Sequence, residues 1–377
     1  MRITLICATL GAGGAERVMT LMANYWAESG HDVAMATFEA HTQSHYPLRS
    51  RVKLVPTSLN SASPTIFHSI LNNVRRIGKL RRAIVETRPD VVISFIETAN
   101  VRVLASLFGT GIPIIVSERS NPAVYKPGKV WEALRLMLYP VASRVVVQSS
   151  RAKDYFPRRI RSLCRVIPNP VLIPEGFRRR NTIRRDGPKR IIALGRLSEE
   201  KCYDLLIRTF GRIQARHPEW TLEIVGDGPL RQTLVQLRDE LRLQGRVELS
   251  GLSKAPFEKL GQADMFVLTS RFEGFPNALC EAMAAGLPVV SFDCPNGPRE
   301  IIRDGVDGIL VPHQDAEALA NAMERVMGDS ELQEWLASRA PEILDRFGID
   351  RVMRMWEDTI AEVASVSVQF QRTQETH

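Results

Sequence analysis

Short apolar segments alternate with stretches of helical spacing through the first half of the chain. Between these segments, apolar residues recur every three or four positions, as they do in residues 15–29. A short apolar run followed by a helical stretch, repeated several times, is typical of parallel βα units. We therefore expect a doubly wound parallel sheet, with strands at 2–9, 33–38, 91–96, 113–118 and 144–149.

The pattern is interrupted after Asn169-Pro170 and then begins again. Residues 178–188 are polar and highly charged and close on Gly187-Pro188, a combination that is typical of a linker. A second series of short apolar runs follows, with helical stretches between them. The strands expected in this second half are 190–195, 221–226, 246–251, 265–270, 287–292 and 308–312.

Two wound units in series predict an α/β protein with two facing Rossmann-like domains. We expect an N-terminal domain over 1–175, a linker over 176–188, a C-terminal domain over 189–348, and a C-terminal helix and tail over 349–377. In such sheets, ligands bind beyond the carboxyl ends of the strands, so we expect the functional site in a cleft there.

Length and composition agree with this interpretation. The chain has 377 residues, of which 44% are hydrophobic and 24% are charged, enough to form large cores without disulfides or metals. Five scattered cysteines without a CxxC pair indicate core residues in a reducing, cytoplasmic compartment. Residues 1–170 carry 23 Lys and Arg against 10 Asp and Glu. This basic half would suit nucleic acid, anionic lipid or phosphorylated substrates, or it would simply be a solvated surface.

Two cations follow the predicted strand at 190–195. Arg196 and Lys201 lie five residues apart, where the next helix opens. An Arg fork and a Lys point charge at this place suit a diphosphate. Ordinary charge at a helix start would give the same pattern, so these two residues alone do not decide the function.

A denser motif follows the predicted strand at 265–270. Residues 273–276 (E-G-F-P) form a turn that leads into a helix from Asn277, and a helix N-terminus attracts phosphate. Glu281 follows Glu273 by eight residues, about one turn into the helix. Because an anion would repel these acids, we expect them to bind hydroxyls of a sugar and a ribose. Asp264 is expected to be a surface or capping acid.

The stretch over 66–84 predicts a helix with a cationic row. At 100° per residue, Arg75, Lys79 and Arg82 fall within roughly 60° of one another, with Ile and Leu residues opposite. Such a row suits a pyrophosphate or anionic lipid headgroups, or it is the solvated face of a packed helix. Arg81 lies nearer the apolar side, which favours a helix that leans on a membrane. Phe67 alone supplies an aromatic ring, which argues against nucleic acid.

The motif over 271–288 carries a resemblance to a known family. The motif contains an E-G-F-P-N turn and then C-E-A-M-A-A-G-L-P-V-V, whose Glu follows the first by eight residues. It resembles retaining glycosyltransferases of the GT-B fold, in glycosyltransferase family 4. The resemblance covers nearly the whole chain and implies a C-terminal helix that crosses back to the first domain. It implies that Arg196 and Lys201 hold a diphosphate. It also implies that Glu273 contacts the transferred sugar and Glu281 the ribose.

Further donor contacts are implied by the same resemblance. They are the Gly13-Gly14 turn within G-G-A-E-R, the loop at Gly251-Leu252, and the backbone at Phe275, Pro276 and Asn277. As a dinucleotide fingerprint the N-terminal turn fails, because Glu16 takes the place of the third glycine. No D-x-D element is present, and His41 and His45 lack a third ligand. We therefore expect no cofactor and no metal.

Motifs of the first domain narrow the resemblance. S-F-I-E-T-A-N at 94–100 and V-S-E-R-S-N-P-A-V-Y-K-P at 116–127 are similar to those of PglH-type N-acetylgalactosaminyltransferases, which act on lipid-linked oligosaccharides. Exopolysaccharide galactosyltransferases share them. The resemblance implies that the basic helix holds the lipid pyrophosphate, through Arg75, Arg76, Lys79 and Arg82.

One position departs from this pattern. Many relatives carry a His after the S-E pair, near the reacting sugar, and Arg119 stands there in this chain. Since Arg is permanently cationic, it suits a departing phosphate or an acceptor phosphate better than a neutral contact. Pairing with the adjacent Glu118 is the structural alternative.

Together these features predict a retaining, metal-independent hexosyltransferase on the cytoplasmic face of the cell membrane. The expected donor is a UDP-sugar carrying N-acetylgalactosamine, galactose or glucose, and the expected acceptor is a polyprenyl-diphosphate-linked oligosaccharide. The basic domain is expected to contact an anionic membrane surface, with no nucleic acid as partner. Two alternatives stay open: an enzyme that uses a GDP- or ADP-sugar and a soluble acceptor, and an inactive scaffold that binds sugar nucleotides.

Overall fold

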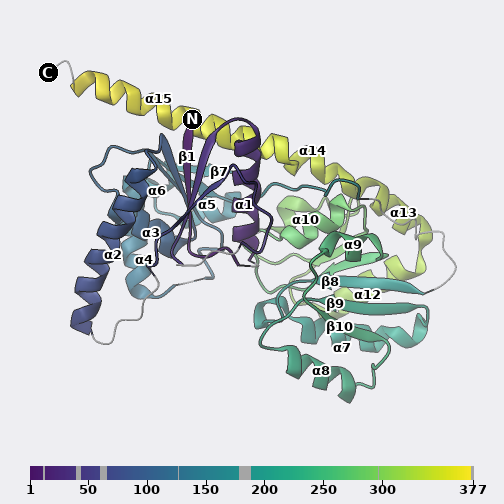
Figure 1. Cartoon of the computed structure of the whole chain (residues 1–377). Helices are drawn as coiled ribbons and strands as arrows, with labels where there is room; N and C mark the ends of the chain where they lie inside the picture. The colour runs from purple at the N-terminus through teal and green to yellow at the C-terminus, as the bar shows by residue number, and fades with distance from the viewer. Residues whose placement is uncertain are drawn as a thin grey trace. The chain divides into compact units, whose positions relative to one another are not determined.

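The chain folds into two compact α/β units (Figure 1). Unit 1 comprises Met1–Asn169 and Val352–His377, and unit 2 comprises Pro170–Arg351. Each is a parallel sheet with helices wound around it, which confirms the predicted fold class. Side chains at 66–74 and 366–374 are left out of the description. The computed structural model otherwise describes residues 1–11, 13–39, 44–59, 66–125, 127–177, 188–295 and 297–374.

Unit 1 is built on a seven-stranded sheet of order β3-β2-β1-β4-β5-β6-β7, in which every pairing is parallel. Two strands were not predicted: β3, at an edge, has mostly exposed side chains, and β7 has only three residues. Neither gives an apolar run that a pattern search can find. The strands are β1 (Arg2–Cys7), β2 (Asp32–Thr37), β3 (Lys53–Pro56), β4 (Val91–Phe95), β5 (Ile114–Ser117), β6 (Arg144–Val147) and β7 (Cys164–Val166).

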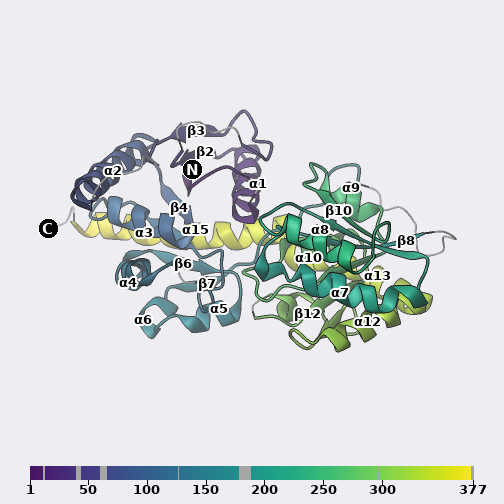
Figure 2. The ribbon, with the colours of Figure 1, turned by 90° about the horizontal axis from the view of Figure 1, so that it is seen from below.

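The helices of unit 1 cover this sheet, and α2, α3 and α4 lie next to one another in both ribbon views (Figures 1 and 2). The last helix, α15, brings the end of the chain back to unit 1, where Trp356 is fully buried and stacks on Phe95. This confirms the expected return of the C-terminal helix. The helices are α1 (Gly14–Glu28), α2 (Ile66–Glu86), α3 (Glu97–Ser106), α4 (Lys129–Leu138), the 3₁₀ turn η1 (Tyr139–Val141), α5 (Ser150–Tyr155), α6 (Arg158–Arg161) and α15 (Ile349–Gln374).

Unit 2 is built on a six-stranded parallel sheet of order β10-β9-β8-β11-β12-β13. All six predicted strands are present, each within two or three residues of its expected range. The chain first runs outward from β8 to β10, and then returns to the other side of β8 with β11. The strands are β8 (Lys189–Leu194), β9 (Trp220–Val225), β10 (Val247–Gly251), β11 (Met265–Leu268), β12 (Val289–Phe292) and β13 (Ile309–Val311).

Helices of unit 2 alternate with these strands. A 3₁₀ turn at Ala340–Glu342 separates α13 from α14, because Pro341 cannot donate an intrahelical hydrogen bond. The helices are α7 (Tyr203–Ile213), α8 (Arg231–Glu240), α9 (Pro256–Gly261), α10 (Asn277–Ala284), α11 (Pro298–Ile301), α12 (Ala316–Gly328), α13 (Ser330–Arg339) and α14 (Ile343–Phe347).

The division between the units differs from the predicted boundaries. Unit 1 ends at Asn169 instead of 175, because Val171 pairs with Gly348 in a β-bridge and so belongs to unit 2. The return to unit 1 occurs at Val352 instead of 349. Most of the predicted linker, residues 178–187, lies outside the described residues.

Other expectations are settled at this level. All five cysteines are buried and free, as expected for core residues. Asp264 is not a surface acid: it is buried and accepts the backbone N–H of Arg190 at 2.7 Å. Within the described part of the chain, no helix has both the length and the apolar character needed to span a bilayer.

Candidate active site

In unit 2, the strand order reverses between β8 and β11, and two of the predicted site residues meet there. Lys201 follows β8 and Glu273 follows β11, and the Lys201 Nζ lies 2.7 Å from the Glu273 Oε1. Their side chains are 19% and 11% exposed. Ligands of doubly wound sheets bind at such a reversal, beyond the carboxyl ends of the strands. The sequence motifs therefore converge where the fold favours a ligand.

The loops that carry this pair are tied to each other. Ser270 Oγ donates to the same Oε1 of Glu273 at 2.6 Å, and Thr269 Oγ1 donates to the carbonyl of Lys201 at 2.8 Å. The backbone N–H of Arg271 donates to the carbonyl of Glu200 at 2.7 Å. These bonds orient the carboxylate and the ammonium before any ligand arrives, which is the preorganisation that charge stabilisation requires.

Two glycines let the strand ends approach each other closely. A Cβ at Gly226 would lie 1.9 Å from the carbonyl oxygen of Gly195, and a Cβ at Gly195 would lie 2.8 Å from the hydroxyl of Tyr203. Any other residue at Gly226 would force the loops after β8 and β9 apart. The sequence analysis did not single out Gly226, although a glycine directly after a predicted strand is a usable signal.

The other predicted donor residues of unit 2 line the same ends of the strands. Arg196 is exposed in the loop after β8, and no ion pair joins it to a described carboxylate. Leu252 follows β10 and is 70% exposed. Glu281 is buried in the second half of α10.

The turn before α10 offers fewer amides than expected. Pro276 has no N–H, and the N–H of Asn277 donates to the carbonyl of Phe275 at 2.9 Å. Of the three amides predicted to face the donor, the one at Phe275 therefore remains. The turn is closed by Gly297, where a Cβ would lie 2.5 Å from Pro276 Cδ. Gly297 was not predicted, since nothing in its local pattern indicates this contact.

In unit 1, the predicted Gly13-Gly14 turn precedes α1. The carboxylate of Glu16 folds back over it, so that a Cβ at Gly13 would lie 2.1 Å from Glu16 Oε2. Thr9 Oγ1 donates to Glu16 Oε1 at 3.0 Å and fixes this arrangement. The lack of a side chain at Gly13 therefore makes room for the Glu16 carboxylate at the start of α1.

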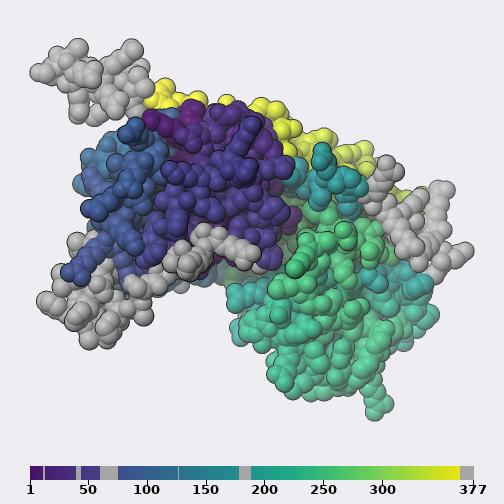
Figure 3. Space-filling model, viewed as in Figure 1, coloured from purple at the N-terminus to yellow at the C-terminus, as the bar shows by residue number. Residues whose placement is uncertain are grey.

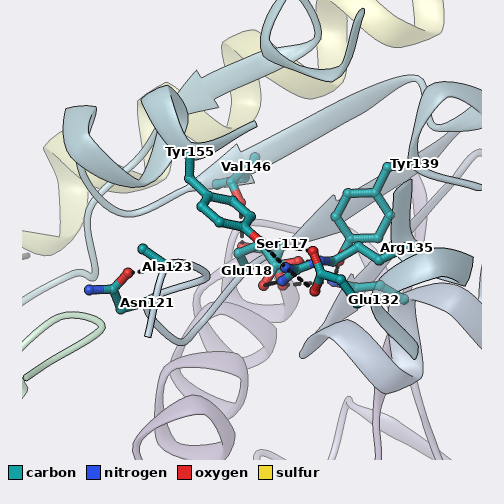
Figure 4. Close-up of polar contacts among 10 residues, drawn as sticks. Ser117, Glu118, Asn121, Ala123, Glu132, Arg135, Tyr139, Val146 and Tyr155 are labelled. Atoms are coloured by element: carbon teal, nitrogen blue, oxygen red, sulfur yellow. Dashed lines mark hydrogen bonds and ion pairs between the residues drawn. The ribbon is translucent and has the colours of Figure 1, made fainter. Parts of the chain in front are cut away.

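Glu118, at the end of β5, does not pair with Arg119 as the structural alternative supposed. Its carboxylate accepts a hydrogen bond from the Tyr139 hydroxyl, and its Oε2 lies 3.6 Å from Arg135 Nη1 (Figure 4). Burial raises the pKa of Glu118 to about 7, although Arg135 and Tyr139 oppose this shift. Arg135 also pairs with Glu132 at 2.6 Å. The sequence indicated none of this buried network, because the partners are 14 to 21 positions away along the chain.

Arg119 instead turns toward the ends of the neighbouring strands. Its Nη1 donates to Asn169 Oδ1 at 2.6 Å, which also accepts Gln148 Nε2 at 2.5 Å. The guanidinium carbon lies 3.4 Å from the ring centre of Phe95. Nε and Nη2 of Arg119 are buried and have no hydrogen-bond partner among the described residues. Burial lowers the pKa of this guanidinium, since no carboxylate balances its charge.

The basic helix α2 presents its cations to solvent. Arg75, Lys79 and Arg82 are exposed, and Arg76 is half-buried. In the space-filling view, which is coloured by residue number, blue atoms of the first half of the chain reach the surface of unit 1 (Figure 3). Arg81 lies on the side of α2 that packs against α3: its Nη1 donates to the carbonyls of Ser106 at 3.3 Å and Phe108 at 3.1 Å, at the end of α3. This agrees with the predicted place nearer the apolar side, and the lean of the helix on a membrane stays a prediction.

Metal ligands are not assembled in the part of the chain that the structure describes, where no three His, Cys, Asp or Glu side chains form a group that could hold an ion. His41 lies outside the described residues, and His45 packs edge-on against Tyr46. The expectation of a metal-free reaction stays a prediction.

Comparisons with known proteins agree with this arrangement. Residues 12–172 match the model of Glycosyltransferase Family 4, and residues 176–343 match that of glycosyl transferases group 1. The chain is 32% identical to a relative from Campylobacter jejuni, with 96% of this chain and 99% of the relative covered. That relative is named GalNAc-alpha-(1->4)-GalNAc-alpha-(1->3)-diNAcBac-PP-undecaprenol alpha-1,4-N-acetyl-D-galactosaminyltransferase.

Solved structures share the fold. Sucrose-phosphate synthase from Thermosynechococcus elongatus superposes with a TM-score of 0.83 at 18% identity, covering 97% of this chain and 99% of its own. HepE from Anabaena, in complex with UDP, gives a TM-score of 0.76 at 19% identity, covering 96% and 100%. Because family models match both halves and a relative aligns over nearly its whole length, this chain belongs to glycosyltransferase family 4 and is a glycosyltransferase of the GT-B fold.

Proposed function

We propose that this enzyme transfers a sugar from a UDP-sugar to a polyprenyl-diphosphate-linked oligosaccharide, with retention of the anomeric configuration. The C. jejuni relative, by its name, acts on an undecaprenyl-diphosphate-linked glycan and transfers N-acetylgalactosamine. HepE, which shares the fold, binds UDP. N-acetylgalactosamine is therefore the first donor sugar to test, with galactose and glucose after it.

The observation that carries the proposal is the pairing of Lys201 with Glu273 at the strand reversal of unit 2. In the donor complex, the ammonium of Lys201 exchanges this carboxylate for the diphosphate, and Arg196 contributes a second positive charge. Glu273 is then available to accept hydrogen bonds from hydroxyls of the transferred sugar. Glu281, within α10, would bind the ribose.

This arrangement suits front-face attack without a covalent enzyme intermediate. The bond between the anomeric carbon and the phosphate oxygen breaks, and the acceptor hydroxyl attacks from the same face. The departing phosphate oxygen takes the acceptor proton. Arg196 and Lys201 stabilise the negative charge that develops on the leaving diphosphate, a contribution that is largest in a site where solvent is excluded.

Arg119 is proposed to contact a phosphate group, of the departing nucleotide or of the acceptor. Support comes from its two buried, unpartnered N–H donors and from the lack of a carboxylate beside it. A buried cation without a counter-ion is costly, so an anionic substrate group would relieve this cost. A His at this position could not offer the same forked donor set.

The acceptor is proposed to enter over α2, where Arg75, Lys79 and Arg82 form an exposed cationic row with Arg76 beside it. Its diphosphate would lie against this row while the lipid tail stays in the bilayer. The enzyme would then work as a peripheral protein on the cytoplasmic face of the membrane, held in part by anionic lipid.

The test begins with thermal unfolding of the purified protein in EDTA, against UDP, GDP, ADP and UDP-sugars. A ligand at 100 times its dissociation constant adds about 2.7 kcal/mol to the free energy of unfolding. We expect stabilisation by UDP and by one UDP-sugar, and transfer of that sugar to a lipid-linked acceptor. Stabilisation by GDP or ADP alone would overturn the donor class, and stabilisation without transfer would favour the inactive scaffold.

A further inference from the structure

Helix α4 carries apolar side chains on both faces: Trp131, Leu134 and Leu138 pack against the core of unit 1, and others point to solvent. Arg135 has no exposed surface, whereas Val130 is 71% exposed, Met137 63% and Leu136 40%. Val141, in the 3₁₀ turn that continues the helix, is 45% exposed. A soluble helix normally turns its apolar residues to the core and its charges to water. The outward face of α4 is therefore apolar.

The inward face explains why the helix cannot simply rotate. Arg135 Nη2 lies 2.6 Å from Glu132 Oε2, and Arg135 Nη1 lies 3.6 Å from Glu118 Oε2 (Figure 4). Tyr155 adds a hydrogen bond to the Glu132 carboxylate at 2.8 Å. Rotating α4 to bury Val130 and Met137 would expose or unpair a fully buried guanidinium, which is strongly unfavourable. The ion-pair network thus fixes the apolar face outward.

Cations border this apolar face. Lys129 begins α4 and is exposed. At the other end, α6 packs against the 3₁₀ turn that contains Val141, and its Arg158 and Arg159 are exposed. An apolar strip with basic residues at both ends matches a bilayer surface, where acyl chains accept the apolar groups and anionic headgroups meet the cations.

We propose that α4 is a docking surface for an anionic phospholipid bilayer. Val130, Leu136, Met137 and Val141 would enter the boundary between headgroups and acyl chains, and Arg158 and Arg159 would contact lipid phosphates. The proposal rests on the proposed function, because an acceptor that is anchored in the membrane gives the enzyme a reason to dock there. It adds a surface separate from the cationic row of α2.

The experiment measures co-flotation of the full-length protein with vesicles of phosphatidylcholine, with and without phosphatidylglycerol. Wild type is expected to bind the anionic vesicles, and the double variant Val130→Glu/Met137→Glu to bind them about tenfold more weakly or worse, because two apolar contacts are lost. Arg158→Glu/Arg159→Glu should weaken binding to anionic vesicles and leave the weak binding to neutral ones unchanged. The matched control is Leu241→Glu/Trp335→Glu, at exposed apolar residues of unit 2, which should bind as wild type does.

Circular dichroism and the melting temperature verify that each variant folds, and the milder Met137→Ser replaces a double variant that does not. Unchanged vesicle binding in the folded α4 variants would overturn the proposal. So would a wild type that ignores vesicles but forms a dimer that Val130→Glu/Met137→Glu disrupts, since α4 would then face a second copy of the chain. Stabilisation by UDP and transfer to a detergent-solubilised acceptor are measured in parallel. If the wild type binds vesicles but shows neither stabilisation by UDP nor sugar transfer, the proposed function is refuted and the docking surface still stands.

Discussion

The ion pair between Lys201 and Glu273 shows how a single contact can serve two states of an enzyme. At 2.7 Å and largely shielded from water, it gives each group a partner of opposite charge while no donor is bound. Ser270 holds the carboxylate through its own hydrogen bond. In the proposed donor complex, Glu273 would therefore keep a partner after Lys201 turned to the diphosphate.

Replacing Lys201 tests this role. We expect Lys201→Ala to lower kcat by about 10²–10³, because a preorganised charge facing the leaving group is lost. Steady-state transfer of the sugar measures the effect. Lys259→Ala is the matched control: Lys259 makes an ion pair of the same length with Glu223, which Arg190 also pairs, and no role in transfer is assigned to it. Near wild-type turnover in Lys201→Ala would remove this residue from the mechanism.

Glu118 gives a prediction in pH. Its pKa is raised by burial to about 7, above the ordinary value of 4.5. The folded state therefore holds the proton more tightly than the unfolded state. Its contribution to the free energy of unfolding is complete below the ordinary pKa and is lost as pH rises through about 7. In Glu118→Gln, which cannot titrate, this loss is absent.

The measurement compares urea unfolding of wild type and Glu118→Gln between pH 5 and pH 8. The stability of wild type relative to the variant should fall across this range, by up to about 3 kcal/mol. A difference that is constant with pH would mean that the carboxyl keeps its charge throughout, held by Arg135.

At the scale of elements, α2 shows what a periodic pattern can and cannot predict. The 3.6-residue period placed Arg75, Lys79 and Arg82 on the solvent side and Leu80 and Ile84 in the core, as the structure has them. Arg81 donates hydrogen bonds to two carbonyls at the end of α3, 25 or more positions away, and the pattern did not predict these partners. A helical wheel gives the faces of one helix and does not show which other elements pack against them.

Charge reversal on α2 tests the acceptor contact. We expect Arg75→Glu/Lys79→Glu/Arg82→Glu to raise KM for the lipid-linked acceptor about tenfold or more, since each charge-assisted phosphate contact is lost. KM for the donor should not change. Initial rates at varied acceptor and donor concentrations separate the two effects.

A control for this reversal uses three exposed arginines of unit 2. Arg208→Glu/Arg242→Glu/Arg325→Glu changes the net charge by the same amount, away from α2. If it raises the acceptor KM as much as the α2 variant does, the effect is one of overall charge and the row on α2 has no special role.

Helix α15 supplies a second prediction for an element. Trp356 is fully buried in unit 1, against Phe95. We expect Trp356→Ala to destabilise unit 1 by about 3–5 kcal/mol, from the lost contacts and the cavity left behind. Hydrogen–deuterium exchange should show lost protection over residues 1–169. Trp220→Ala, at an equally buried position of unit 2, should lose protection in unit 2 and keep it in unit 1. Equal loss of protection in both units in either variant would contradict the view that each unit has its own core.

For the whole molecule, the repeat of short apolar runs was enough to predict two doubly wound units, whereas the family was recognised from the motif over 271–288. The repeat also predicted which strand ends lie together, because parallel strands of one sheet present their carboxyl ends on one side. The sequence did not predict contacts between distant positions. The Arg135 network, the Asn169 contact of Arg119 and the closing Gly297 have no local signature. The predicted boundary at 175 lies beyond the division at Asn169, because Val171, Ile173 and Phe177 pack against the core of unit 2.

The full reaction is expected to need no metal. In the proposed mechanism, Arg196 and Lys201 would supply the charge that a divalent ion supplies in other sugar transferases, so EDTA should leave the transfer rate unchanged. Assays with EDTA, and with Mg²⁺ or Mn²⁺ restored, measure this. Activity that disappears with EDTA and returns with either ion would show that the two cations are not sufficient.

The return of α15 to unit 1 has a consequence for synthesis on the ribosome. Unit 1 is the first to emerge, yet the segment from Val352 that completes its core follows all of unit 2. At about 5–20 residues per second, roughly 180 intervening residues take about 10–40 s to translate. During that time Phe95 lacks the ring of Trp356 that covers it in the complete fold. A chain terminated before Val352 would leave apolar side chains of unit 1 exposed, and such surfaces favour aggregation.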